Sequence, residues 1–102
     1  MHLVEILLPL YDSHGRVQRS ELFLQTEHEL VERFGGVTAF LRAPAQGKWR
    51  SPDGKVEHDE IVICEVMAED LDREWWRDYR ERLARRFAQD ELVVRASVFE
   101  AL

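Results

Sequence analysis

The chain has 102 residues, a formal net charge of −6 and a hydrophobic fraction of 45%. Its length and composition fit one globular domain over residues 1–102, with a modest core and no linker-like stretch. The negative charge argues against general binding to nucleic acid or anionic membranes, because both partners would repel the protein at long range. The arginines of residues 77–86 are interleaved with Asp78 and Glu81. We therefore interpret that segment as a solvated helix face and expect no nucleic-acid partner.

Cys64 is the only cysteine, which excludes an intrachain disulfide and a CxxC motif. Because it lies within an apolar run, we expect a buried and unreactive thiol. Residues 1–10 lack the basic segment and the cleavage site of a signal peptide. No apolar segment approaches the roughly 20 residues that are needed to cross a bilayer. We therefore expect a cytoplasmic protein with no membrane partner.

Residues 3–10 are apolar at almost every position, which predicts a strand covered on both faces, ended by Pro9 and a turn at 12–15. A helix is expected from about Ser20, a residue that suits an N-cap, to Gly35-Gly36, which supplies a left-handed C-cap. A start at Thr26, with Glu29 completing a capping box, is the alternative.

Residues 37–43 predict a short second strand, which Pro44 interrupts in the manner of an edge strand. The sequence of residues 51–54, Ser-Pro-Asp-Gly, is a strong hairpin-turn signal. It joins residues 37–49 to a long third strand at 56–67. That strand is almost continuously apolar from residue 60 onward, as the first strand is.

A second helix is expected after Asp70, which can serve as its N-cap. Its apolar residues recur at steps of four and predict one buried stripe: Leu71, Trp75, Tyr79, Leu83 and Phe87. Residues 92–99 then alternate apolar and polar, which predicts a last strand.

The order strand, helix, strand, strand, helix, strand predicts an α+β fold of the ferredoxin-like βαββαβ type. In this fold two helices cover one face of a four-stranded antiparallel sheet. Its crossovers place the strands at 3–10 and 56–67 in the centre, which is where the two continuous apolar runs fall. The face without helices must then be polar or be covered by a partner.

Alternation along the strands places Glu5, Glu65, Arg42 and Arg95 on this helix-free face, among apolar side chains. We expect a homodimer whose sheets pack face to face, with the two glutamates paired to the two arginines. The sharper hypothesis is a cavity between sheet and partner that binds a small molecule. Glu5 or Glu65 would then be the catalytic acid or base, and Arg42 and Arg95 would contact the ligand.

Trp75 and Trp76 point about 100° apart on a helix, so both cannot lie at the centre of one stripe. We expect Trp75 in the core and Trp76 beside it or over the sheet edge; the alternative is that Trp76 forms an aromatic ligand platform. The four histidines lack the spacing of a metal site, and no nucleotide-binding or hydrolase motif occurs. The sequence therefore predicts neither a metal nor a cofactor.

The segments 32–38, 47–49, 59–63 and 65–67 resemble those of small uncharacterised bacterial α+β proteins. More loosely, the pattern is similar to the dimeric α+β barrel superfamily, which includes cofactor-independent monooxygenases, isomerases and haem-handling members. The resemblance implies a fold and carries no catalytic residue.

Three functions stay open at this point. The first is a homodimeric domain that binds a small molecule at its helix-free face. The second is a cofactor-independent enzyme, monooxygenase- or isomerase-like, acting on a small organic substrate. The third is a protein–protein interaction module.

Overall fold

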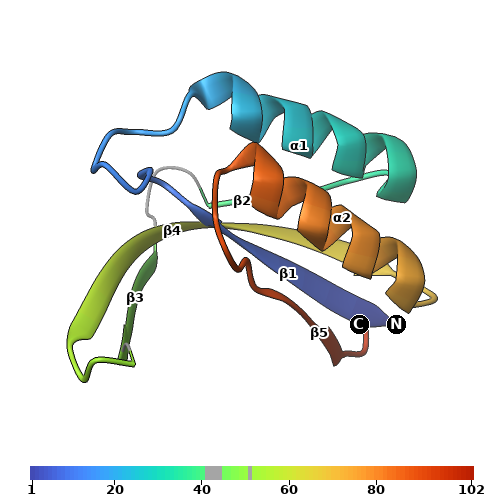
Figure 1. The fold of residues 1–102 in the computed structure, drawn as a ribbon. Helices are drawn as coiled ribbons and strands as arrows, with labels where there is room; N and C mark the ends of the chain where they lie inside the picture. Colours follow the sequence, from blue (N-terminus) through green and yellow to red (C-terminus); the bar gives the residue numbers. More distant parts are fainter. Residues whose placement is uncertain (41–44, 51) are drawn as a thin grey trace.

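The computed structural model describes residues 1–40, 45–50 and 52–102. The elements in chain order are β1 (His2–Pro9), α1 (Ser20–Phe34), β2 (Thr38–Ala39), β3 (Ala45–Arg50), β4 (Val56–Ala68), α2 (Arg73–Arg86) and β5 (Val94–Val98). Figure 1 shows both helices on the same face of the sheet. The predicted α+β class, with helices on one face of an antiparallel sheet, is therefore confirmed.

The sheet has the order β2-β4-β1-β5, and β3 also pairs with β4. Every pairing is antiparallel. The two continuously apolar strands, β1 and β4, lie in the centre as predicted. Of the described residues of the predicted second strand at 37–43, Thr38 and Ala39 pair with β4, so the strand begins at Thr38 and not at residue 37. Residues 41–44 of that predicted strand lie outside the described residues.

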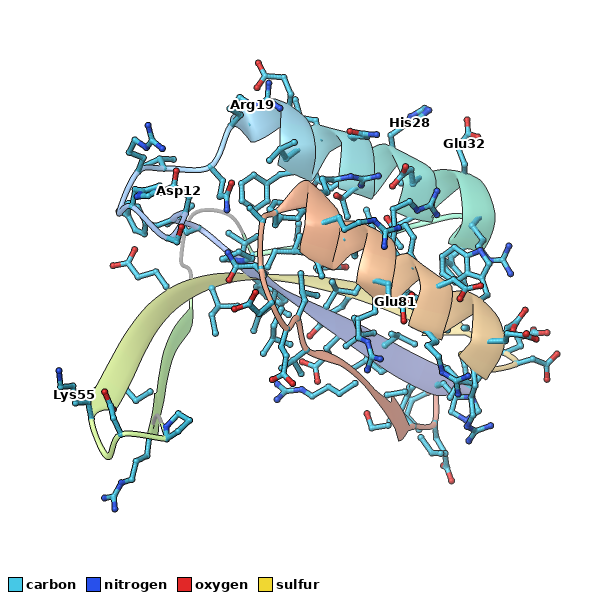
Figure 2. All side chains as sticks on the ribbon, viewed as in Figure 1. Asp12, Arg19, His28, Glu32, Lys55 and Glu81 are labelled. Carbon is cyan, nitrogen blue, oxygen red and sulfur yellow. The ribbon has the colours of Figure 1, made fainter. Side chains whose placement is uncertain are left out.

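The β3–β4 hairpin bends away from the helices (Figure 1), and Lys55 lies at its far end (Figure 2). The turn contains Gly54 at a φ of 86°, a left-handed conformation that glycine adopts without a steric penalty. The predicted turn position is therefore confirmed for the described residues 52–54. On the outer side of α1, His28 and Glu32 point away from the sheet (Figure 2).

The core lies between the sheet and the helices. The helix-side residues of the two central strands are exposed by 2% or less: Val4, Ile6, Leu8, Val62, Cys64 and Val66. Phe23 and Leu30 of α1 pack against them, together with Tyr79 and Leu83 of α2. The face assignment that alternation predicts for β1 and β4 is confirmed.

The ends of α1 depart in part from the prediction. Ser20 is the first helical residue, and the N-cap is Arg19, which makes no side-chain capping bond. The alternative start at Thr26 is wrong, because this residue is buried inside the helix and its Oγ1 donates to the Leu22 carbonyl at 2.8 Å. Gly35 is confirmed as the C-cap, with a φ of 82° and its N–H bonded to the Val31 carbonyl.

The N-cap of α2 is Asp72 and not Asp70, because the Asp72 carboxylate accepts the N–H of Trp75 at 3.1 Å. The predicted stripe is also wrong at its start: Trp76 is only 6% exposed, whereas Trp75 is half-buried. The physical reason is that a helix has about 3.6 residues per turn, so a stripe at steps of four drifts by about 40° at each step. Trp76, three residues before Tyr79, therefore faces the core.

A polar cluster joins the two helices beside this core. Arg86 donates to both carboxylate oxygens of Glu29, at 2.7 and 2.9 Å, and also to the hydroxyl of Thr26. The Tyr79 hydroxyl donates to Glu29 at 2.9 Å. Burial alone would raise the pKa of Glu29, but the hydrogen bonds from Arg86 and Tyr79 and the charge of Arg86 outweigh it, so the pKa lies below its ordinary value. The ionised carboxylate therefore stabilises the packing of α1 on α2.

We expect Arg86→Met to lower the free energy of unfolding by about 1–3 kcal/mol at pH 7, because it leaves the Glu29 carboxylate without its strongest partner. In the wild type this stabilisation is complete above the ordinary carboxyl pKa of 4.5 and is lost as the pH falls through the lower folded value. The variant should therefore lose part of the acid dependence of stability. Urea unfolding between pH 7 and pH 3 measures both effects.

The matched control is Arg85→Met, since Arg85 is exposed and makes no ion pair with a described residue. Equal destabilisation by the two variants would contradict the role given to Arg86.

Candidate functional site

Four polar residues form one row across the helix-free face. The sheet register places Glu5 of β1 opposite Glu65 of β4 and, on its other side, opposite Arg95 of β5. Thr38 of β2 lies opposite Glu65 and completes the row. Directly opposed residues have Cβ atoms about 4.5–5.5 Å apart, so the two carboxylates are close neighbours. We call these four residues the carboxylate row.

The charges of the carboxylate row are unequal. Arg95 Nε lies 3.2 Å from Glu5 Oε1, with side-chain exposures of 57% for Arg95 and 23% for Glu5. Glu65 is half-buried and makes no ion pair or hydrogen bond with a described side chain. Of the two opposed glutamates, one is paired and one is not, so the described part of the row has an excess of negative charge.

Apolar side chains surround the row. Leu3 and Leu7 of β1 and Ile61 and Ile63 of β4 are half-buried on this face, and Met67 is 60% exposed. Phe40, whose N–H donates to the Ile63 carbonyl, is 43% exposed. An apolar surface of this kind marks a binding face more often than a surface that faces only water.

A groove of about 430 Å³ lies at the end of the row formed by Glu65 and Thr38. The C-terminal end of α1 forms one wall through Phe34, Gly35 and Gly36. Strand residues form the rest of the lining: Leu3, Val37, Thr38, Glu65 and Met67. The last carbonyls of a helix carry a partial negative charge, so this end of α1 favours a cation. Glu65 adds a full negative charge to the same groove.

This arrangement can hold a small organic cation. The Glu65 carboxylate and the end of α1 supply the negative charge, and the Phe34 ring and Met67 supply apolar contact. The adjacent Glu5 can accept a hydrogen bond or a proton where its pairing with Arg95 leaves an oxygen free. The groove therefore contains the carboxylate of Glu65, and the carboxylate of Glu5 lies beside it.

The structure brings together three of the five site residues that the sequence predicted: Glu5, Glu65 and Arg95. Arg42 lies outside the described residues. Trp76 is buried in the core on the helix-bearing side of the sheet, so the alternative of an exposed Trp76 platform is wrong. Its ring packs beside Trp75, as expected, with 4.8 Å between the ring centroids. Its ring stacks on Phe34 at 5.1 Å between centroids.

The sequence reasoning missed the α1 wall of the groove. It assigned Gly35-Gly36 to helix termination alone, although only Val37 separates the pair from Thr38, the residue opposite Glu65. When a helix C-cap comes shortly before an edge strand, the end of the helix lies near the strand that pairs with that edge strand. In this chain, that strand is β4, which carries Glu65. Within residues 1–40, 45–50 and 52–102, no group of three or more histidine, cysteine, aspartate or glutamate residues is placed to hold a metal ion.

The helices of the described chain are all too short or too polar to span a membrane. No protein-family model matches this sequence, and no curated protein matches it. Among solved structures, the fold is similar to that of a phage SAM lyase in complex with S-methyl-5'-thioadenosine. That match has a TM-score of 0.61, 15% identity, and coverage of 94% of this chain and 79% of the lyase chain. The apo state of a phage SAM lyase gives a TM-score of 0.60, 14% identity, and coverage of 94% and 78%. At this identity the likeness concerns the fold alone.

Cys64 provides a test of the face assignment, because it lies directly between Ile63 and Glu65 but points to the helix side. It is 1% exposed, and burial raises its pKa to about 12. We expect the native thiol to resist a disulfide reagent at pH 8 and to react fully in urea, since both burial and protonation oppose attack. Rapid labelling of the folded protein would contradict the register of β4.

Proposed function

We propose that the protein binds a small organic cation on the helix-free face, in the groove beside Glu65. The observation that carries the proposal is the sheet register, which opposes Glu5 and Glu65 while Arg95 pairs with Glu5. A cationic ligand would offset the remaining negative charge. The apolar surroundings would strengthen the attraction, because they lower the local dielectric constant.

The structural neighbours support the choice of probe. The neighbouring protein is named a SAM lyase, and one of its structures contains S-methyl-5'-thioadenosine. S-adenosylmethionine carries a sulfonium cation, whereas S-methyl-5'-thioadenosine has a neutral thioether at the corresponding sulfur. The pair therefore separates recognition of positive charge from recognition of the adenosine part. A difference in affinity between the two compounds would show whether the Glu65 carboxylate recognises the positive charge of the ligand.

We further propose that a second copy of the chain covers the helix-free face, as in the dimeric α+β barrel superfamily. The exposed side chains of Phe40 and Met67 and the half-buried side chains of β1 and β4 support this arrangement. Two copies would also bring two carboxylate rows near each other. A bound cation would then reduce the repulsion between them, which links the ligand to association.

A second candidate function is enzymatic cleavage of the same class of molecule. The opposed carboxylates of Glu5 and Glu65 favour it. A free carboxylate can remove a proton from the carbon β to a sulfonium sulfur. The C–H electron pair then forms a carbon–carbon double bond, the C–S bond breaks, and its electrons stay on sulfur as a neutral thioether. Glu65 is the better base of the two, because Glu5 already accepts a bond from Arg95. This chemistry needs no cofactor.

We expect S-adenosylmethionine to bind more tightly than S-methyl-5'-thioadenosine in isothermal titration calorimetry. Glu65→Gln should weaken binding of the sulfonium compound by about tenfold, which is about 1.4 kcal/mol, and should leave the neutral compound nearly unchanged. Chromatography of the same mixtures for released S-methyl-5'-thioadenosine separates binding from cleavage. Release by the wild type and none by Glu65→Gln would favour the enzyme.

The control is Glu69→Gln, which removes an exposed carboxylate outside the groove. Choline, a quaternary ammonium ion without an adenosine part, tests the wider class of cations. The proposal fails when neither cation binds, or when Glu65→Gln and Glu69→Gln weaken binding equally.

For the second copy, we expect light scattering to give the mass of a dimer for the wild type and of a monomer for Met67→Lys combined with Phe40→Lys. The matched control combines Leu24→Lys with Val31→Lys on α1. These two residues are 61% and 45% exposed, against 60% for Met67 and 43% for Phe40. A monomeric wild type, or equal effects of the two double variants, would contradict the dimer.

A further inference from the structure

A second concave region lies on the helix-bearing side of the sheet, between α2 and β5. It is a groove of about 260 Å³ with apolar side chains in its lining, Trp76 among them. The charged residues that line it are Arg73, Arg77, Arg80 and Arg95, of which Arg95 is already paired with Glu5, and none of its described lining residues is acidic. In a chain with a net charge of −6, this is a marked local concentration of positive charge.

Three of these arginines follow one face of α2. Arg73, Arg77 and Arg80 occupy positions i, i+4 and i+7, which lie on the same side of a helix. All three are exposed, and none forms an ion pair with a described residue. Other arginines of α2 have partners: Arg86 binds Glu29, and Arg82 lies 4.9 Å from the centre of the Tyr79 ring.

The positions of these arginines work against the helix itself. Arg73 is the first residue of α2, at the positive end of the helix dipole, where a cation is unfavourable. Like charges at i, i+4 also repel each other. A bound anion would reverse both effects, because it would interact favourably with the dipole and with the guanidinium groups. Asp72 at the N-cap and Glu74 in the first turn offset part of this cost, and a bound anion would offset more of it.

We propose that the groove between α2 and β5 binds an elongated phosphate-bearing anion. Arginine matches the geometry of phosphate oxygens and can bind two of them at once. The three helix positions span about 10 Å along the axis, which is more than one phosphate group can bridge. The apolar lining, to which Trp76 contributes, leaves room for a non-polar part of the same molecule. This proposal does not depend on the cation site on the other face.

The test is titration of the full chain with inorganic phosphate, pyrophosphate and tripolyphosphate in a non-phosphate buffer. We expect affinity to rise along this series and to fall with added salt, because the contacts are charged and exposed. Arg77→Gln, at the centre of the row, should weaken binding of tripolyphosphate by tenfold or more. Arg80→Gln provides a second variant and should have a similar effect.

The matched control is Arg85→Gln, which removes an exposed arginine of the same helix that does not line the groove. It should change the affinity by less than twofold. Equal weakening by Arg85→Gln and Arg77→Gln would show attraction to the helix as a whole and would overturn the proposal. No binding of any of the three anions would also overturn it, as would equal affinity for phosphate and tripolyphosphate.

Discussion

The pairing of β1 with β4 determines where every candidate residue of the helix-free face lies. Eight residue pairs join the two strands, from His2 with Ala68 to Pro9 with Ile61. A shift of one residue would move Val4 and Ile6 out of the core and would turn Glu5 toward the helices. The core therefore holds the register in place, because burial of the helix-side row is possible in one alignment only. The opposition of Glu5 and Glu65 is a consequence of that packing.

The two faces of the sheet differ in whether their charged side chains have partners of opposite charge. On the helix side, the Arg86 side chain is only 9% exposed; Glu29 and Thr26 accept its hydrogen bonds, and Tyr79 donates to Glu29. On the other side, Glu5 has Arg95, whereas Glu65 has no charged partner within the described residues. The polar cluster between the helices thus has a structural role that its geometry explains. Among the described residues, the carboxylate row keeps one carboxylate without a charged partner, and the proposed cation site rests on this charge.

The sequence predicted the architecture well, because the information lies in local patterns. Continuous apolar runs identified the central strands, and alternation assigned Glu5, Glu65 and Arg95 to one face. The boundaries were harder to predict, since Asp70 and Asp72 are equally good N-cap residues and only the fold selects Asp72. The choice between Trp75 and Trp76 also needed the rotation of α2 about its axis. The groove at the end of α1 depends on how a helix end lies beside a strand, which no local pattern contains.

One further consequence concerns the outer edge of β5. No other described strand pairs with it, so its free N–H and C=O groups could recruit another polypeptide into a growing fibre. The strand is only five residues long, and Arg95 is its second residue. Arg73, Arg77 and Arg80 lie close to the same edge, because they line the same groove. Two such edges that approach each other would meet like charges, which discourages aggregation through this edge.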